Sequence, residues 1–321
     1  MLSIARVLRE EQPRINAVLD REIDMLPETV REVARHTLHA GGKRLRPLLA
    51  AYMGRLFGSR HEHIYTMAAA IEFVHVASLI HDDVLDNATT RRGILSAHKV
   101  FTPTIAILGG DVMLAHAAGM VARIGDQYIS QQFAEAVVKT ATGEIDEFRH
   151  QGNIDLAYED YLAMITGKTA WILRVACQLP AYFAGADEER TAAAAEFGLE
   201  LGIAFQIVDD ALDIRPSRDT GKPSGGDLRE RKCTPLTRFY LESLPEAEAG
   251  AFAAKFAAGS FTDQEIENII KDMSGKGLEA RTRELAQIHL DKAAKALALL
   301  PDNKERSVLA MVPDFIKNRG S

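Results

Sequence analysis

Two stretches of the sequence carry three aspartates each in the same pattern. They read LIHDDVLDN and QIVDDALDI, so each presents Asp-Asp-x-x-Asp among apolar residues. On an α-helix the first and third aspartates of this pattern share a face, because successive residues turn through about 100°. The motifs therefore predict one carboxylate pair from Asp82 and Asp86 and a second from Asp209 and Asp213.

Carboxylates one helical turn apart repel each other, so a positive partner is expected. Oxygen ligands without cysteine or a histidine cluster favour a hard cation, and Mg²⁺ usually takes one or two protein carboxylates while keeping water and substrate phosphates. A solvated acidic helix face would explain one such motif. Two copies favour a site that holds several Mg²⁺ ions around a phosphate group.

Basic clusters supply the opposite charge. They contain Lys43, Arg44 and Arg46 in GGKRLRP, Arg91 and Arg92 in TTRRG, and Lys168 with Thr169 in TGKTA. Each cluster alone is compatible with a solvated surface, but a glycine-rich turn before a helix also suits an anion. TGKTA is not a nucleotide-binding loop, because Leu162 occupies the place of the required first glycine.

His75 lies seven residues before Asp82, two helical turns earlier on the same stripe. A single histidine on an apolar helix is usually a core residue. Its alignment with the carboxylates makes His75 a candidate ligand-binding residue.

The remaining pattern is helical nearly throughout. Alanine, leucine and other apolar residues recur at spacings of three and four, and runs typical of strands are few. We expect an all-α protein with one domain over residues 1–321. The segment 215–227 is rich in Gly, Pro, Ser and Asp and could close over a site.

Composition narrows the functional classes. The net charge of −7 argues against general nucleic-acid binding. Two cysteines, Cys177 and Cys233, form no disulfide framework and no metal-binding pattern. The N-terminal residues lack the apolar run of a signal peptide, and we expect no stable membrane insertion and a cytoplasmic location.

The motifs together resemble the trans-isoprenyl diphosphate synthases of the polyprenyl synthetase family. GGKRLRP, LIHDDVLDNATTRRG, GDVML, KTA, FQIVDDALD and GKPSGGDLRERK occur in the order and at roughly the spacing of that family, over about residues 40–235. One departure is Pro235 directly after Thr234, where relatives tend to have an apolar residue before the proline, which leaves Lys232 less firmly placed. Beyond about residue 236 only generic helices match.

The resemblance implies a bundle of antiparallel helices around a central cavity, usually as a homodimer. It implies that the metal ligands are Asp82, Asp86 and Asp209, supported directly or through water by Asp83, Asp210 and Asp213. It places the allylic diphosphate on Arg91, Lys168, Thr169, Gln206 and Lys222. It places the diphosphate of isopentenyl diphosphate on Lys43, Arg46, His75 and Arg92.

The implied reaction is a head-to-tail prenyl transfer. Metal ions and cations stabilise the departing pyrophosphate, and the allylic cation is attacked by the double bond of isopentenyl diphosphate. No protein general base is evident, so the proton would pass to the pyrophosphate. A class I terpene cyclase, a head-to-head condensing enzyme and a non-catalytic subunit of a two-component synthase remain alternatives. The cyclase would not need the second diphosphate site, and the subunit would be expected to lack aspartates.

Residues before the first motif predict product length. In short-chain members of this family, bulky aromatic residues just before the first aspartate close the cavity floor, whereas this chain has Ala77 and Ser78. Val74 and Ile71 lie further back on nearly the same stripe. We expect products in the octaprenyl range for quinone side chains, with a short-chain farnesyl or geranylgeranyl synthase as the alternative. Small residues that merely permit close helix packing would also explain the pattern.

Overall fold

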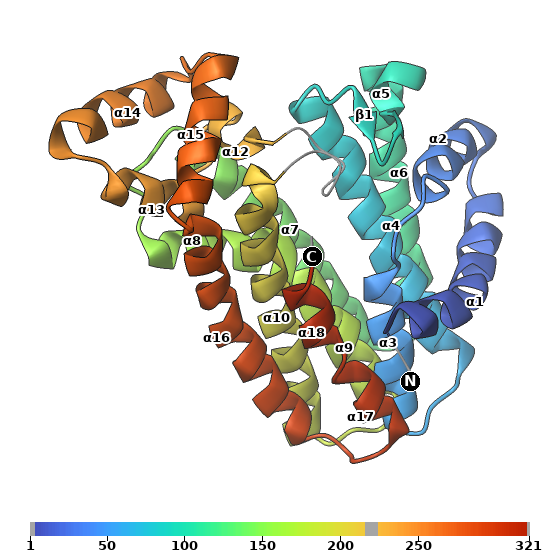
Figure 1. The fold of residues 1–321 in the computed structure, drawn as a ribbon. Coiled ribbons are helices and arrows are strands. Elements are labelled where there is room, and N and C mark those ends of the chain that lie inside the picture. The colour runs from blue at the N-terminus through green and yellow to red at the C-terminus, as the bar shows by residue number, and fades with distance from the viewer. Residues whose placement is uncertain (1–3, 216–223, 320–321) are drawn as a thin grey trace. The chain divides into compact units, whose positions relative to one another are not determined.

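The chain folds almost entirely into helices, as the sequence predicts (Figure 1). The computed structural model describes residues 4–215 and 224–319. Its only strands within these ranges are β1 (Thr90–Arg91) and β2 (Ile94–Leu95), an antiparallel pair directly after the first Asp-rich motif. Lys222 and most of the predicted closing segment lie outside the described residues.

The helices follow one another with short connections. They are α1 (Ile4–Asp24), α2 (Glu28–Leu38), α3 (Leu45–Leu56), α4 (Glu62–Leu85), α5 (Ala97–Val100), α6 (Pro103–Ala122), α7 (Gln127–His150), α8 (Tyr158–Ile165), the π-helix η1 (Thr166–Ala170), α9 (Trp171–Phe183), α10 (Glu188–Ala211), the 3₁₀ helix η2 (Leu212–Ile214), α12 (Gly226–Arg229), α13 (Pro235–Ser243), α14 (Glu246–Ala258), α15 (Asp263–Gly275), α16 (Leu278–Ala298), α17 (Lys304–Leu309) and α18 (Val312–Lys317).

These elements form two compact units. Unit 1 comprises Met1–Val137, Ile172–Gly198 and Ala296–Val312, and unit 2 comprises Val138–Trp171, Leu199–Lys295 and Pro313–Ser321. The first Asp-rich motif belongs to unit 1 and the second to unit 2. The prediction of a single domain over residues 1–321 stays a prediction.

Helix α4 is the core of unit 1. It packs mainly against α6 and α3. Its apolar residues lie on all sides of the helix, so most of its surface is buried. Phe73 and Met67 are fully buried. The helix ends at Leu85 with Asp86 as its C-cap, and the left-handed backbone of Asn87 then changes the direction of the chain. The first Asp-rich motif is therefore the C-terminal turn of a rigid, buried helix.

In unit 2, glycines bring η1 close to α7. A Cβ atom added to Gly143 would lie 2.2 Å from the backbone nitrogen of Lys168, so only glycine fits this contact. The backbone at this contact is a π-helix, a form that is frequent at functional sites. This local geometry sets the direction of the Lys168 side chain.

Three helical segments are long and apolar enough to cross a membrane by length and composition. They are Glu62–Leu85, Pro103–Ala122 and Glu188–Ile214, and the expectation of no stable membrane insertion stays a prediction. The apolar windows of the first and third are 72% buried inside the protein, but that of Pro103–Ala122 is only 39% buried. The apolar character of α4 and α10 is thus explained by the core, and that of α6 only in part.

The contact of Gly143 with η1 can be tested by substitution. Gly143→Ala should destabilise the protein by about 1–3 kcal/mol, because the added methyl group forces α7 away from the backbone of Lys168. Denaturant unfolding measures the change. Gly250→Ala on α14 is the matched control, since nothing lies within 4 Å of its added Cβ. Equal stability of the two variants would contradict the close contact.

Candidate active site

The first Asp-rich motif divides into an outer pair and one inner carboxylate. Asp82 is half-buried and Asp86 is exposed, one turn apart as the sequence predicts. Asp83 is 3% exposed and lies on the buried side of α4. The three carboxylates of the motif therefore do not face the same surroundings.

Asp83 binds an arginine of the following hairpin. Its Oδ1 accepts hydrogen bonds from Arg91 Nε at 2.8 Å and Arg91 Nη2 at 2.5 Å. This charge-assisted contact fixes β1 to the last turn of α4. Asp83 therefore orients Arg91, and its expected support of a metal ion stays a prediction.

The second motif has the same division but a different backbone. Helix α10 ends at Ala211, and Asp213 lies in the 3₁₀ helix η2, so the predicted continuous α-helix through Asp209 and Asp213 is wrong. Both residues are half-buried. Asp213 accepts hydrogen bonds from the backbone nitrogens of Gly226 at 2.9 Å and Asp227 at 3.2 Å. These bonds fasten the chain that follows the loop to the motif.

Asp210 is the inner carboxylate of the second motif. It is 7% exposed, and it accepts hydrogen bonds from Tyr161 Oη at 2.5 Å and Gln206 Nε2 at 2.9 Å. Burial raises the pKa of Asp210 to about 7, against these hydrogen bonds and with the help of the negative charges of Asp209 and Glu147. Asp210 thus orients Tyr161 and Gln206, and its expected support of a metal ion stays a prediction.

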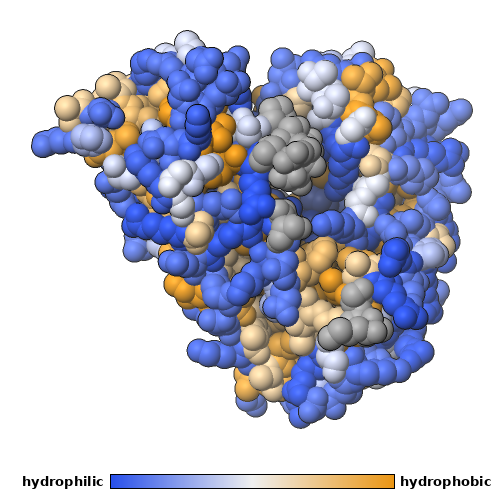
Figure 2. Space-filling model, viewed as in Figure 1, coloured by the Kyte–Doolittle hydropathy of each residue, from blue (hydrophilic) through white to orange (hydrophobic). Residues whose placement is uncertain are grey.

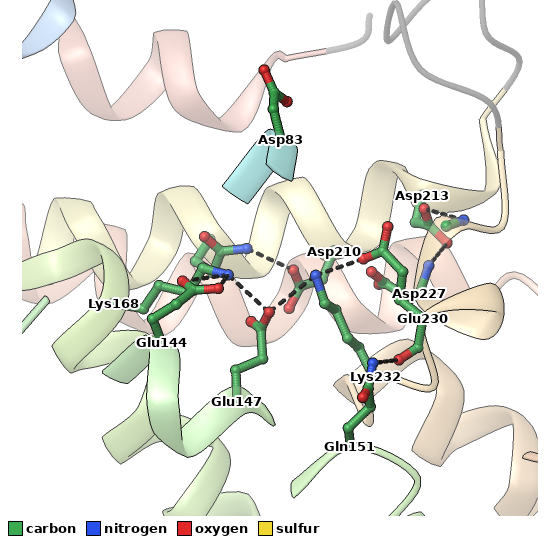
Figure 3. A network of polar contacts seen from close by, with 12 residues as sticks. Asp83, Glu144, Glu147, Gln151, Lys168, Asp210, Asp213, Asp227, Glu230 and Lys232 are labelled. Atoms are coloured by element: carbon green, nitrogen blue, oxygen red, sulfur yellow. Dashed lines mark hydrogen bonds and ion pairs between the residues drawn. The ribbon is translucent and has the colours of Figure 1, made fainter. Parts of the chain in front are cut away.

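Lys168 lies in a network of alternating charge, which Figure 3 shows from close by. Its Nζ contacts Glu144 at 2.9 Å and Glu147 at 2.8 Å, and Glu147 also contacts Lys232 Nζ at 3.0 Å. Burial would raise the pKa of Glu147, but Lys168 and Lys232 bring it below its usual range. Glu147 is thus an ionised carboxylate shared by two lysines, and it holds them close together.

Thr169 and Gln206 are brought together as well. Thr169 Oγ1 donates to Gln206 Oε1 at 2.8 Å, and Gln206 in turn donates to Asp210. The hydrogen bonds run from η1 through α10 to α8, so Thr169 and Gln206 belong to one hydrogen-bonded chain with Asp210 and Tyr161.

The predicted residues of unit 1 also converge. Arg92 Nη1 donates to the carbonyl oxygen of Gly41, and a Cβ on Gly42 would lie 2.9 Å from the same guanidinium. The pKa of His75 is lowered well below its usual value, first by burial and then by the charges of Arg46 and Arg92. His75 is therefore a neutral imidazole beside a cluster of arginines, a setting in which it can donate a hydrogen bond to an anion without adding charge.

The residues predicted to set product length lie in two environments on α4. Ile71, Val74 and Ala77 are buried in unit 1, whereas Ser78 is half-buried and donates to the carbonyl oxygen of His75 at 2.9 Å. Ser78 thus shares the half-buried stripe of His75 and Asp82, as the helical spacing predicts. A pocket lies on another flank of α4, beside Val76 and Ile80.

Several site residues escaped the sequence analysis. They are Glu144, Glu147, Tyr161, Asp227 and Arg319. Arg319 contacts Asp209 Oδ1 at 2.8 Å from the far end of the chain. The acidic run GEIDEF was the only local signal for the two glutamates, and nothing near Tyr161 or Arg319 marks them in the sequence.

The donor set fits a hard cation that keeps part of its water shell. Among the described residues, no group of three His, Cys, Asp or Glu side chains is close enough to enclose a metal ion. Outer carboxylates that are half-buried or exposed nevertheless suit Mg²⁺, which takes one or two protein oxygens and completes its shell with water and phosphate. Asp82, Asp86, Asp209 and Asp213 are the residues that could hold it.

Comparison with known proteins identifies the family. The polyprenyl synthetase family model matches residues 27–273. The chain is 32% identical to heptaprenyl diphosphate synthase component 2 of Bacillus subtilis (99% of each chain) and 30% identical to a short chain isoprenyl diphosphate synthase of Methanothermobacter thermautotrophicus (99% of each).

A solved structure agrees over the same length. The polyprenyl synthase of Caulobacter crescentus, complexed with calcium and isoprenyl diphosphate, has a TM-score of 0.94 and 31% identity, covering 99% of this chain and 97% of that one. The fold, the two Asp-rich motifs and these relatives together establish that the chain belongs to the polyprenyl synthetase family of trans-isoprenyl diphosphate synthases and is a prenyltransferase.

Proposed function

We propose that the protein adds isopentenyl diphosphate units head to tail to an allylic diphosphate and so makes a long all-trans polyprenyl diphosphate. The observation that carries this proposal is the division found in both motifs. Each motif pairs two outer carboxylates with one buried carboxylate that orders groups predicted to bind diphosphate. A merely acidic surface would not repeat that arrangement.

The chain's own residues would perform most of the work. Lys43, Arg46, His75 and Arg92 would hold the diphosphate of isopentenyl diphosphate, and Arg91, Lys168, Thr169 and Gln206 would hold the allylic diphosphate. Bound Mg²⁺ would supply Lewis-acid stabilisation of the pyrophosphate leaving group. The lysines and arginines would strengthen this stabilisation by charge-assisted hydrogen bonds to the same oxygens.

Proton loss would not require a protein base. Around the reacting carbon atoms, the apolar residues of α4 would exclude water from the allylic cation. The pyrophosphate, once released and still bound by the cations, is the nearest base of sufficient strength. The carbon–carbon bond formation would leave a cationic centre on the isopentenyl unit. The carbon next to that centre would lose a proton to the pyrophosphate, and the electron pair of the broken C–H bond would form the new double bond.

We further propose products in the octaprenyl range, of the kind used for quinone side chains. Ala77 and Ser78 are small, and the side chain of Ser78 lies on the same half-buried stripe as Asp82. The relatives include both a heptaprenyl and a short-chain enzyme, so their names alone do not choose between lengths. The short-chain alternative predicts termination at fifteen or twenty carbons.

A homodimer is proposed from the exposed face of α6. Ile105, Ile107 and Leu108 are 42%, 40% and 55% exposed, and neighbouring apolar residues gather over α5 and the preceding hairpin (Figure 2), where Leu95 and Val100 are exposed. Exposed apolar faces of this kind mark interaction surfaces. A second copy is the occupant favoured here, because homodimers are the usual state implied by the resemblance.

We also propose a cytoplasmic location. Cys177 and Cys233 are both free and buried, which suits a reducing compartment.

Metal ligation is tested with isolated enzyme, Mg²⁺, farnesyl diphosphate and isopentenyl diphosphate. Asp82→Ala and Asp209→Ala should each lower turnover by about 100-fold or more, because charge stabilisation of the leaving group is lost. Pyrophosphate release measures turnover. Asp291→Ala, on the exposed face of α16, is the control and should keep normal activity. No release by the wild-type enzyme with either short or long allylic primers would refute the synthase proposal.

Product length is tested at Ser78. Ser78→Phe should shorten the final product while preserving the first condensation, because the ring would obstruct a chain that grows along the stripe from Asp82. Chromatography of the dephosphorylated products gives the length distribution. Ser59→Phe, in the turn before α4, is the control. A wild-type product of fifteen or twenty carbons, or an unchanged product profile for Ser78→Phe, would contradict the proposal that a long product grows along this stripe.

The dimer face is tested at Leu108. Leu108→Arg should convert the protein to monomers, because a buried unpaired charge at an apolar interface is costly. Sedimentation velocity measures the oligomeric state. Ile288→Arg on α16, where the side chain is 53% exposed, is the matched control. A monomeric wild-type protein would overturn the proposal, and its flotation with phospholipid vesicles would assign the face to a membrane instead.

A further inference from the structure

The three cations of GGKRLRP diverge in the structure. Lys43 is exposed and Arg46 is half-buried, as expected of residues that bind a ligand. Arg44, between them, is 6% exposed and points into the core. The predicted diphosphate residues do not include Arg44, and a buried arginine at this place needs a separate explanation.

Arg44 is bound to two parts of unit 1. Its Nη1 donates to Glu72 Oε1 at 2.6 Å, and its Nη2 donates to the carbonyl oxygen of Leu38 at the end of α2. The side chains of Arg44 and Glu72 are only 4% and 3% exposed. Burying such a pair costs desolvation energy that the attraction between the charges rarely exceeds by much. Stability alone is therefore a weak reason for the pair.

The location of the pair offers a stronger reason. Arg44 directly precedes α3 and has a left-handed backbone, with φ of +51°, that sends Lys43 and Arg46 in different directions from it. Glu72 lies on α4 three residues before His75, so the two share one side of the helix. The ion pair thus joins the loop that carries two of the predicted diphosphate ligands to the helical turn that carries a third.

Further bonds hold the rest of this loop. Gln12 Nε2 of α1 donates to the carbonyl oxygen of Gly42 at 3.1 Å, and Arg92, the fourth predicted ligand, donates to that of Gly41. Both glycines have positive φ, of 93° and 143°, so the loop backbone depends on such contacts for its shape. Arg44 fixes the loop from inside the core, through Glu72 and the carbonyl oxygen of Leu38.

We propose that the buried Arg44–Glu72 ion pair positions Lys43, Arg46 and His75 for the diphosphate of isopentenyl diphosphate without touching that substrate. The inference rests on the proposed function, since it names the substrate of the unit 1 cluster. Glu72 also places one fixed negative charge beside the arginines of this cluster. Because that charge is already bound to Arg44 inside the core, it does not compete with the diphosphate for Lys43 or Arg46.

The test replaces the pair by apolar residues of similar size. Arg44→Met combined with Glu72→Leu should leave the fold stable, because well-packed apolar residues often replace a buried ion pair without loss. The KM for isopentenyl diphosphate should rise about tenfold or more, while kcat and the KM for the allylic diphosphate change by less than about threefold. A pair with a purely structural role would change the two Michaelis constants equally or not at all.

Direct binding gives a second readout. Calorimetric titration with isopentenyl diphosphate alone should show the same weakening in the double variant, without any turnover. Arg44→Lys should be intermediate, because an ammonium group cannot span both Glu72 and the carbonyl oxygen of Leu38 as the guanidinium fork does. Glu200→Met with His289→Leu is the matched control, since these residues form a buried pair in unit 2.

The outcomes separate the two proposals. Wild-type protein that binds isopentenyl diphosphate but transfers no prenyl group would refute the proposed function, and the calorimetric comparison would still test the positioning role. Active variants with an unchanged KM and unchanged binding for isopentenyl diphosphate would overturn the positioning role alone. If circular dichroism shows that the double variant is unfolded, Arg44→Lys decides, and wild-type affinity in that variant would overturn the inference.

Discussion

Each Asp-rich motif crowds three carboxylates at the end of one buried helix. The repulsion within each motif is the constraint on which the surrounding side-chain contacts depend. Asp82, Asp83 and Asp86 crowd the C-terminal turn of α4, where the helix dipole already disfavours negative charge. One carboxylate of each motif, Asp83 or Asp210, is buried and hydrogen-bonded, which reduces this repulsion. Arg91 neutralises Asp83, and burial raises the pKa of Asp210 to about 7. The outer carboxylates, Asp82, Asp86, Asp209 and Asp213, are the more exposed members of the two motifs.

This division could be predicted only in part. The helical period fixes Asp82 and Asp86 on one face and turns Asp83 about 100° away, so the pair was readable from spacing. Which side of the helix is buried depends on packing against α6 and α3, and no local pattern supplies that. The second motif shows the limit more clearly, because α10 gives way to a 3₁₀ turn before Asp213. The all-helical fold itself followed from composition and periodicity alone.

Contacts between side chains that are distant in the chain could not be predicted from the sequence. Asp209 and Arg319 are 110 residues apart, yet their side chains contact each other at 2.8 Å. Lys168 was recognised from its motif, whereas Glu147, which holds Lys168 and Lys232 together, lies in an acidic run typical of any solvated helix. Sequence motifs identified the residues that would meet the ligand. The residues that hold them in place became visible only through tertiary contacts.

The two units use their internal carboxylates differently, and the difference bears on ligand binding. Glu147 contacts Lys168 and Lys232 directly, so a diphosphate that binds either lysine must share it with this carboxylate. Glu72 contacts Arg44 instead, which is not among the predicted diphosphate ligands. A lysine that shares a carboxylate loses part of that ion pair when it binds a ligand, whereas the Arg44–Glu72 pair can affect binding only through the loop that it holds. Affinity in unit 1 should therefore depend on the shape of its loop, and affinity in unit 2 on competition between carboxylate and phosphate.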